Sequence, residues 1–205
     1  RKQQAALLKQ QQENKMRAAN VSKELVEHNQ LPRAVSFVYT DNKKIANILN
    51  YVDARQGQDK HGQFISLQLN DTLNRPRGLQ RIYDNNITKP DGSKTNKDFT
   101  WGMNKDGAHL VIGDIANADR VFVVEGFATG ASVFLAMLAN NKTDKVAVIV
   151  ALDSGNMVKV VDQYKKEQPH LVLHYALDND QHKCKQGKGN AGVLVGINLL
   201  REGLD

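Results

Sequence analysis

The chain has 205 residues, of which 40% are apolar and 24% charged, and its net charge at pH 7 is +6. This length suits one ordinary domain or two small ones, and the composition excludes collagen-like and wholly disordered chains. No apolar run approaches the roughly 18 to 20 residues that cross a bilayer, and no charged-then-apolar leader opens the chain, so we expect neither membrane insertion nor secretion. The one cysteine, Cys184, cannot form an intrachain disulfide and fits a reducing compartment.

The positive charge is distributed unevenly. Residues 1–117 hold 18 Lys and Arg against 12 Asp and Glu, whereas residues 118–205 hold ten of each kind. A basic part beside a neutral part predicts that the upstream residues attract a polyanion and that the downstream residues offer carboxylates to something else. The alternative is a modest surplus that only aids solubility.

Two helices are predicted first along the chain. Residues 2–30 contain neither Gly nor Pro and are rich in Gln, Lys, Ala and Leu, which favours a helix that ends before Pro32. Its apolar residues are too sparse for a heptad seam, so we expect a solvated or partner-dependent helix. A second helix is expected to begin with an N-cap at Thr40 or Asp41, to end before the polar residues 56–62, and to bury a stripe formed by Ile45, Ile48, Leu49 and Val52.

From Phe64 the pattern becomes strand-like. The runs FISLQL, GLQRIY and HLVIG are separated by turn signals, and Pro90-Asp91-Gly92 is the clearest, because proline presets φ and glycine tolerates positive φ. They predict a small antiparallel subdomain. Cations interleaved with aromatic side chains suit a single nucleic-acid strand, which offers phosphates and stacking bases, although a solvated sheet face is the alternative. The candidate residues for binding nucleic acid are Arg75, Arg77, Arg81, Lys94, Lys97 and Trp101.

After Asp119, apolar strands alternate with helices. The strands are VFVVEG, VAVIVALDSG and LVLHYALDND, and three βα units predict an α/β fold with a parallel sheet covered by helices on both faces. Carboxylates follow each strand and should converge at one sheet edge. The repulsion between them is relieved by a divalent cation that takes oxygen ligands, for which Mg²⁺ is the best candidate. These carboxylates belong to Glu125, Asp153, Asp178 and Asp180.

This arrangement resembles the TOPRIM fold of bacterial primases, topoisomerases and certain nucleases, and most closely the TOPRIM primases of plasmids and phages. The likeness spans residues 64–193, where GLQRIY, PDGSK, GAHLVIGD, VFVVEGFATGASV, ALDSGN and GNAG occur in that order. Together with the patterns described above, it predicts an N-terminal helix (1–30), a basic α+β subdomain (31–117) and a TOPRIM-like parallel sheet flanked by helices (118–205). It also implies a DNA primase catalytic region, a nucleotidyltransferase that makes short RNA primers on single-stranded DNA for plasmid or phage replication or transfer.

The resemblance also assigns roles to single residues. Glu125 matches the family glutamate, which binds metal or manages a proton at the attacking or leaving oxygen. Asp178 and Asp180 match the metal-binding pair, with Mg²⁺ or Mn²⁺ as the cofactor, while Asp153 is either a further metal ligand or the cap of the next helix. Gly126 would let the backbone turn sharply and a ligand approach closely. A cationic loop would hold a triphosphate or would be a solvated charge run; it contains Lys183, Lys185 and Lys188.

The implied partners are a single-stranded DNA template, nucleoside triphosphates and a helicase or other replication or transfer protein, in the cytoplasm of a bacterial host. Cys184 stands alone and no Walker A pattern is present, so we expect neither a zinc ribbon nor a P-loop helicase in this stretch. The last strand of the fold is either missing or lies beyond Asp205. Two alternatives stay open: a TOPRIM-type metal-dependent nuclease, and a nucleic-acid-binding or docking module without turnover.

Overall fold

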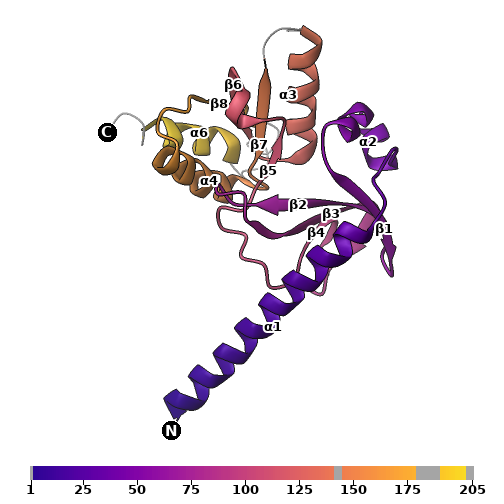
Figure 1. The fold of residues 1–205 in the computed structure, drawn as a ribbon, viewed down its shortest axis with the longest axis vertical. Coiled ribbons are helices and arrows are strands. Elements are labelled where there is room, and N and C mark those ends of the chain that lie inside the picture. Colours follow the sequence, from indigo (N-terminus) through magenta and orange to yellow (C-terminus); the bar gives the residue numbers. More distant parts are fainter. Residues whose placement is uncertain (1, 141–144, 179–189, 202–205) are drawn as a thin grey trace.

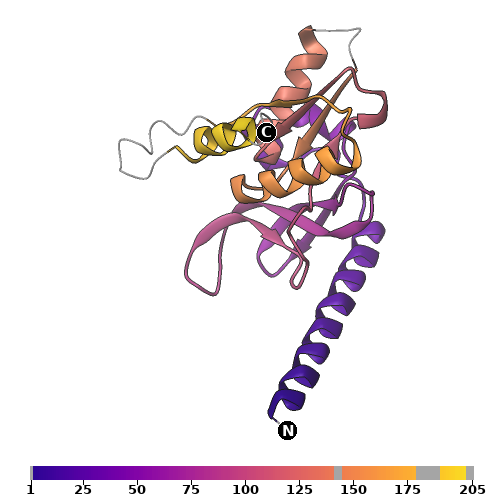
Figure 2. The same cartoon turned by 90° about the vertical axis from the view of Figure 1, so that its left-hand side faces the viewer.

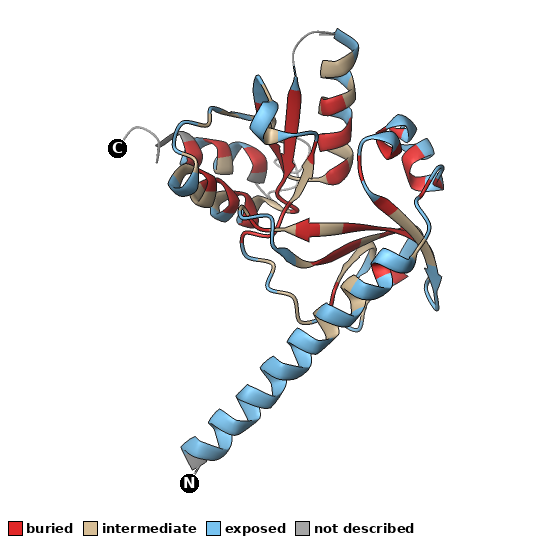
Figure 3. Cartoon of the chain, in the orientation of Figure 1, coloured by how far each residue is buried: buried red, intermediate tan, exposed pale blue. Residues whose placement is uncertain are grey.

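The first element is a long helix that leads away from the rest of the molecule. The computed structural model describes residues 2–140, 145–178 and 190–201. Helix α1 (Lys2–Gln30) projects from the body in both views, with the N-terminal end farthest out (Figures 1 and 2). Residues 3–19 are exposed, as the pale colour of this half shows (Figure 3). The predicted solvated helix is therefore confirmed, and it ends before Pro32, since proline disfavours helical geometry in the residue that precedes it.

The second predicted helix is wrong in its form. The chain makes a short helix α2 (Val38–Asn42) and a separate 3₁₀ helix η1 (Ala46–Asn50). Lys44 lies between them with a φ of 56°, and a left-handed residue cannot continue a right-handed helix. The predicted apolar stripe is nevertheless buried, because both short helices pack on the core; it comprises Ile45, Ile48, Leu49 and Val52.

The first sheet is antiparallel and has the strand order β1-β2-β3-β4. The sequence did not predict β1 or β4, because their polar residues carry no apolar alternation. The turn at Pro90-Asp91-Gly92 is confirmed: Gly92 has a φ of 81°, and the Lys89 N–H donates to the Ser93 carbonyl at 2.9 Å. The strands are β1 (Ala54–Asp59), β2 (Gly62–Asn70), β3 (Pro76–Thr88) and β4 (Lys94–Phe99).

The second sheet has the order β5-β7-β6-β8. Strands β6 (Arg120–Val124), β7 (Val146–Val150) and β8 (Leu173–Tyr175) are parallel, as predicted. Strand β5 (Leu110–Ile112) pairs antiparallel with β7. The expectation that HLVIG belongs to the antiparallel subdomain is therefore wrong for Leu110–Ile112, although His109 makes an antiparallel bridge to Asn70 at the end of β2. Pairing with β5 covers the edge of an apolar strand that would otherwise be open.

Helices cover both faces of this sheet, which confirms the α/β fold class. The alternation along β7 divides its side chains: Val146, Val148 and Val150 pack with α3 (Phe127–Asn140), and Ala147 and Ile149 pack with α4 (Ser154–Glu167) and α6 (Ala191–Arg201). The α3 side of the core continues into Ile65 and Ile82 of the first sheet, so the two sheets share one core. A 3₁₀ turn, η2 (Ile115–Asn117), joins β5 to β6. Among the described residues, none of the helices is both long and apolar enough to span a membrane.

Candidate active site

Glu125 lies at the carboxyl end of the central strand β6. Strand β6 is anchored in the core by buried valines and ends at Val124. Glu125 and Gly126 then connect the strand to α3. The Glu125 residue is half-buried. Parallel neighbours on both sides hold β6 in register, so the backbone on which Glu125 sits is fixed by the sheet. The predicted position of Glu125 at the end of a parallel strand is confirmed.

Asp178 lies beside the start of α3. The pairing of β8 with β6 is extended by the Ala176 N–H, which donates to the Val123 carbonyl at 3.0 Å. Two residues later, Asp178 Oδ1 accepts a hydrogen bond from Thr129 Oγ1 at 3.3 Å. Because Thr129 belongs to the first turn of α3, this contact holds Asp178 close to the strand end that carries Glu125.

Lys97 of β4 reaches this edge from the first sheet. Its Nζ would be 3.9 Å from a Cβ built on Gly126. Burial lowers the pKa of Lys97, the carboxylates of Glu125 and Asp178 raise it, and Lys43 lowers it again, so that the pKa is below its ordinary value. One cation and two carboxylates therefore form a carboxylate–lysine cluster (Lys97, Glu125, Asp178) to which both sheets contribute. The sequence analysis placed Lys97 among nucleic-acid ligands on a sheet face; the structure places it next to the predicted catalytic acids.

The space beside Gly126 is open apart from Lys97. Gly126 does not have a left-handed φ, so the predicted sharp turn is not what requires glycine here. Its carbonyl accepts a hydrogen bond from the Gly130 N–H at 2.9 Å, which begins the helix. The absence of a side chain instead leaves room for a ligand between α3 and the Lys97 ammonium.

Asp153 caps α4, which confirms one of its two predicted roles. Its Oδ1 accepts from the Asn156 N–H at 2.8 Å, and its Oδ2 accepts from the Lys105 ammonium. Burial would raise the pKa of Asp153, but Lys105 and the backbone N–H groups of the helix start hold it below its usual value. Lys105 also lies 4.7 Å from the centroid of the Phe99 ring. Both oxygens of Asp153 are thus engaged, and a role as metal ligand stays a prediction.

The arginines of the first sheet are paired with carboxylates. Arg75 and Arg77 lie 2.8 and 3.6 Å from Asp71 Oδ2, and Arg81 lies 2.9 Å from Glu24 of α1. Their contact with nucleic acid stays a prediction. In this structure Arg75 and Arg77 pair with an aspartate in the turn before β3, and Arg81 holds α1 against the first sheet. Lys94 and Trp101 are exposed.

The carboxylate oxygens of Glu125 and Asp178 are suitable ligands for a magnesium ion. Mg²⁺ is commonly held by one or two carboxylates, with water and substrate phosphates completing its coordination, and Glu125 and Asp178 supply such a pair. Within residues 2–140, 145–178 and 190–201, no three His, Cys, Asp or Glu residues are grouped so as to hold a metal ion. Four predicted site residues lie outside these described ranges: Asp180, Lys183, Lys185 and Lys188.

The sequence did not predict that Lys105 and Thr129 bond to Asp153 and Asp178, or that Lys97 lies near Glu125 and Asp178. Lys97 and Phe99 share one face of β4 by simple alternation, and this signal was missed because the strand itself was not predicted. Thr129 follows Glu125 by four residues, which places it in the first helical turn once the helix start is known. For Lys105, in a loop, no sequence signal exists.

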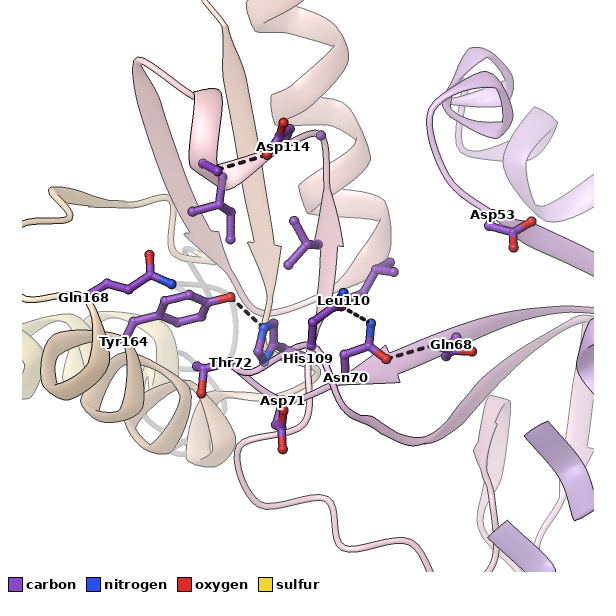
Figure 4. A pocket seen from close by; sticks show the side chains of 15 residues that line it. Asp53, Gln68, Asn70, Asp71, Thr72, His109, Leu110, Asp114, Tyr164 and Gln168 are labelled. Carbon is purple, nitrogen blue, oxygen red and sulfur yellow. Dashed lines mark hydrogen bonds between the residues drawn. The ribbon is translucent and has the colours of Figure 1, made fainter. Parts of the chain in front are cut away.

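A separate cavity of about 520 Å³ lies at the junction of the two sheets (Figure 4). The buried His109 lies in its wall, where Nε2 is 2.8 Å from the Tyr164 hydroxyl and Nδ1 is 3.0 Å from the Gly107 carbonyl. Backbone hydrogen bonds of 2.9 Å in both directions join His109 to Asn70 at the end of β2. None of the predicted site residues lines this cavity. Its polar groups join the sheets and lie apart from the carboxylate–lysine cluster.

Comparison with known proteins gives likenesses in structure alone. No family model matches the sequence, and no curated protein matches it. One similar structure is that of bacteriophage T7 lagging-strand DNA polymerase interacting with primase domains of two gp4 subunits bound to an RNA/DNA hybrid and dTTP, at 11% identity and a TM-score of 0.42, over 70% of this chain and 67% of that one. It contains primase domains.

Two further solved structures are similar to this chain. The primase fragment of the bacteriophage T7 primase-helicase protein matches at 11% identity and a TM-score of 0.40, over 80% of this chain and 55% of that one. The E. coli primase catalytic core matches at 12% identity and a TM-score of 0.37, over 72% of this chain and 59% of that one. This chain therefore spans a little over half to two thirds of the length of these three primase-containing chains.

Proposed function

We propose that this chain is the catalytic region of a DNA primase, which uses Mg²⁺ or Mn²⁺ to make short RNA primers from nucleoside triphosphates on single-stranded DNA. The observation that carries the proposal is the carboxylate–lysine cluster, in which a lysine of one sheet faces two carboxylates at the strand ends of the other. A plasmid or phage replicon in a bacterial cytoplasm, with a helicase or another replication protein as partner, is proposed from the motif order in residues 64–193.

The cluster has the groups that nucleotidyl transfer needs. Glu125 and Asp178 would hold the metal, with Asp180 as the second member of the predicted pair. Held by these residues, Mg²⁺ would supply charge that lowers the pKa of the attacking hydroxyl and offsets the charge of the leaving pyrophosphate. The Lys97 ammonium, poised beside Gly126, would orient the phosphates of the incoming nucleotide and offset their charge. Thr129 fixes the carboxylate of Asp178 through its hydrogen bond. Most of the rate then comes from positioning and charge stabilisation.

The proposal is tested by RNA synthesis on a single-stranded DNA template with nucleoside triphosphates and Mg²⁺ or Mn²⁺. We expect short RNA products from the unaltered chain and none from Glu125→Gln, which keeps the shape of the side chain but removes its charge. Glu167→Gln is the matched control, because Glu167 is an exposed glutamate at the end of α4. Synthesis at the full rate by Glu125→Gln would refute the assignment of the site.

The same assay separates the alternatives. Cleavage of DNA or RNA in the absence of nucleotides, lost in Glu125→Gln, would replace the primase proposal with a nuclease. Binding of single strands with no product under either metal would replace it with a module that has the fold but no turnover.

A further inference from the structure

The positive charge of the sequence is concentrated near its start, most of which forms the projecting part of α1. Residues 1–23 contain six Lys or Arg and one acidic residue, Glu13, a surplus of five charges out of six for the whole chain. Residues 3–19 are exposed and extend over about 25 Å at the rise of an α-helix. This exposed segment (residues 3–19), called the arm, carries Lys9, Lys15 and Arg17 against Glu13, a surplus of two charges that lies away from the sheets (Figure 3).

The apolar residues of the arm do not form a protein-docking stripe. Leu7 and Met16 are nine residues apart, which places them on opposite faces of the helix, and Leu8 points between them. Lys9, Lys15 and Arg17 are exposed and lie on more than one face. Cations spread around a helix suit a flexible polyanion that can wrap it.

An exposed indole stands where the arm meets the first sheet. The side chain of Asn20 donates to the Trp101 carbonyl at 2.9 Å, and Gly102, with a φ of 84°, lies directly against the Arg17 side chain. These contacts fix the loop that carries Trp101, yet 59% of the Trp101 surface remains exposed. A cavity of about 450 Å³ beside it is lined by Asn14, Arg17, Ala18, Gly102, Met103 and Asn104. Large exposed aromatic residues held on a rigid loop beside cations are typical of sites where bases stack.

We propose that the projecting part of α1 and Trp101 form a binding site for single-stranded nucleic acid, in which the helix cations meet phosphates and the indole stacks on an unpaired base. Only the identity of the ligand rests on the proposed function. The site does not include the carboxylate–lysine cluster. It shares Trp101 with the sheet face predicted from the sequence, but not the arginines of that face, which are paired with Asp71 and Glu24.

Trp101 is the one tryptophan of the chain, so its fluorescence reports on this site directly. The full chain is titrated with a 20-nucleotide oligo-dT strand, without metal or nucleotide, over a series of salt concentrations. We expect the fluorescence to be quenched on binding, and the affinity to fall as salt rises. The double variant Lys9→Gln/Lys15→Gln should lose about fivefold in affinity at 0.1 M salt for each phosphate contact removed. The matched control is Lys60→Gln/Lys166→Gln, which removes two exposed lysines elsewhere and should bind as the unaltered chain does.

Two further variants sharpen the test. With a labelled oligonucleotide, Trp101→Leu should weaken binding by about 5- to 150-fold, the range for loss of one stacked base. Glu125→Gln should bind with unchanged affinity although it makes no RNA, so failure of the catalytic proposal would not mimic failure of this one. Fluorescence that does not change at saturating oligo-dT, or equal affinities of the two double variants, would overturn the proposal. If the chain self-associates and oligo-dT does not disrupt this association, the arm is instead a binding surface for a second copy of the chain.

Discussion

At the scale of single residues, Lys97 is held in an environment that opposes its charge. Its half-buried ammonium has a lowered pKa in spite of two nearby carboxylates, because the cost of burial exceeds their attraction. A cation kept under such conditions is desolvated, and a desolvated cation interacts more strongly with an incoming phosphate than a solvated one. On the proposed function, Lys97 would thus bind the substrate phosphates beside the acids of the second sheet.

Replacing this charge tests the role of Lys97. Lys97→Met keeps the length of the side chain, and we expect it to lower RNA synthesis by about 100-fold, the order found when one preorganised charge-stabilising group is removed. The rate is measured under the conditions used for Glu125→Gln. Lys60→Met, at an exposed turn of the first sheet, should leave the rate unchanged. Full synthesis by Lys97→Met would exclude Lys97 from the site.

Asp153 is the second residue whose role can be decided by substitution. Asp153→Ala should lower the free energy of unfolding by about 1 kcal/mol, because α4 loses its N-cap. Asp153→Ser retains a capping oxygen and should stay within about 0.5 kcal/mol of the unaltered chain. Urea denaturation measures both. Loss of RNA synthesis by Asp153→Ser without loss of stability would instead assign this carboxylate to the metal.

At the scale of elements, α6 supports the strand end that carries Asp178. Gly192, at the start of α6, lies so close to the Asp178 backbone that a Cβ would overlap its carbonyl oxygen. Gly196, one turn later, is similarly close to the Leu177 side chain. The second glycine of the GNAG motif therefore allows a close approach of two backbones, which the resemblance alone did not explain.

This contact predicts a difference between two glycine substitutions. Gly192→Ala should displace Asp178 and lower RNA synthesis by at least about tenfold, since small shifts of reacting groups are costly. Gly155→Ala, in α4, meets Asp153 Oδ1 at an ordinary 3.4 Å and should stabilise the helix by up to about 1 kcal/mol without lowering synthesis. Equal rates for the two variants would contradict a supporting role of α6.

At the scale of the whole molecule, two buried histidines join its parts. His28 of α1 lies 2.7 Å from Ser66 Oγ of β2, and His109 connects the first sheet to Tyr164 of α4. Burial lowers the pKa of both; Asp53 opposes this at His28, and the Gly107 carbonyl opposes it at His109. Both contacts are therefore made by neutral imidazoles.

The lowered pKa values predict how stability depends on pH. The unfolded chain binds protons at these histidines as the pH falls through about 6.5, whereas the folded chain binds them only at lower pH. The free energy of unfolding therefore keeps its full contribution from these histidines above this pH and declines below it. Urea denaturation at pH 7.5 and 5.5 measures the decline. His109→Gln should show a smaller decline than the unaltered chain, and the exposed His170→Gln should show the same one. An equal decline in all three proteins would show that His109 does not contribute to the pH dependence of stability.

The elements that the sequence predicted well are those with a strong local pattern. Helix α1 contains no helix breaker, the strands β6 and β7 are continuous apolar runs, and the turn at Pro90-Asp91-Gly92 has residues that set its dihedral angles. The elements predicted wrongly or missed have no such pattern. Strand β4 is polar, and the helix expected from residue 41 onward is broken at Lys44, which has a positive φ.

The sequence by itself determined that this is an α/β protein with acids at the carboxyl ends of parallel strands, because strand periodicity and strand ends are local properties of the chain. Only the tertiary structure decided what those acids meet. Lys97 lies 28 residues before Glu125 and Asp178 lies 53 after it, and no local pattern fixes such distances. The net charge of +6 and its surplus in residues 1–23 are properties of the sequence, but the surroundings of these charges follow from packing, since the arginines of the first sheet are paired with carboxylates whereas Lys9, Lys15 and Arg17 of the projecting helix are exposed.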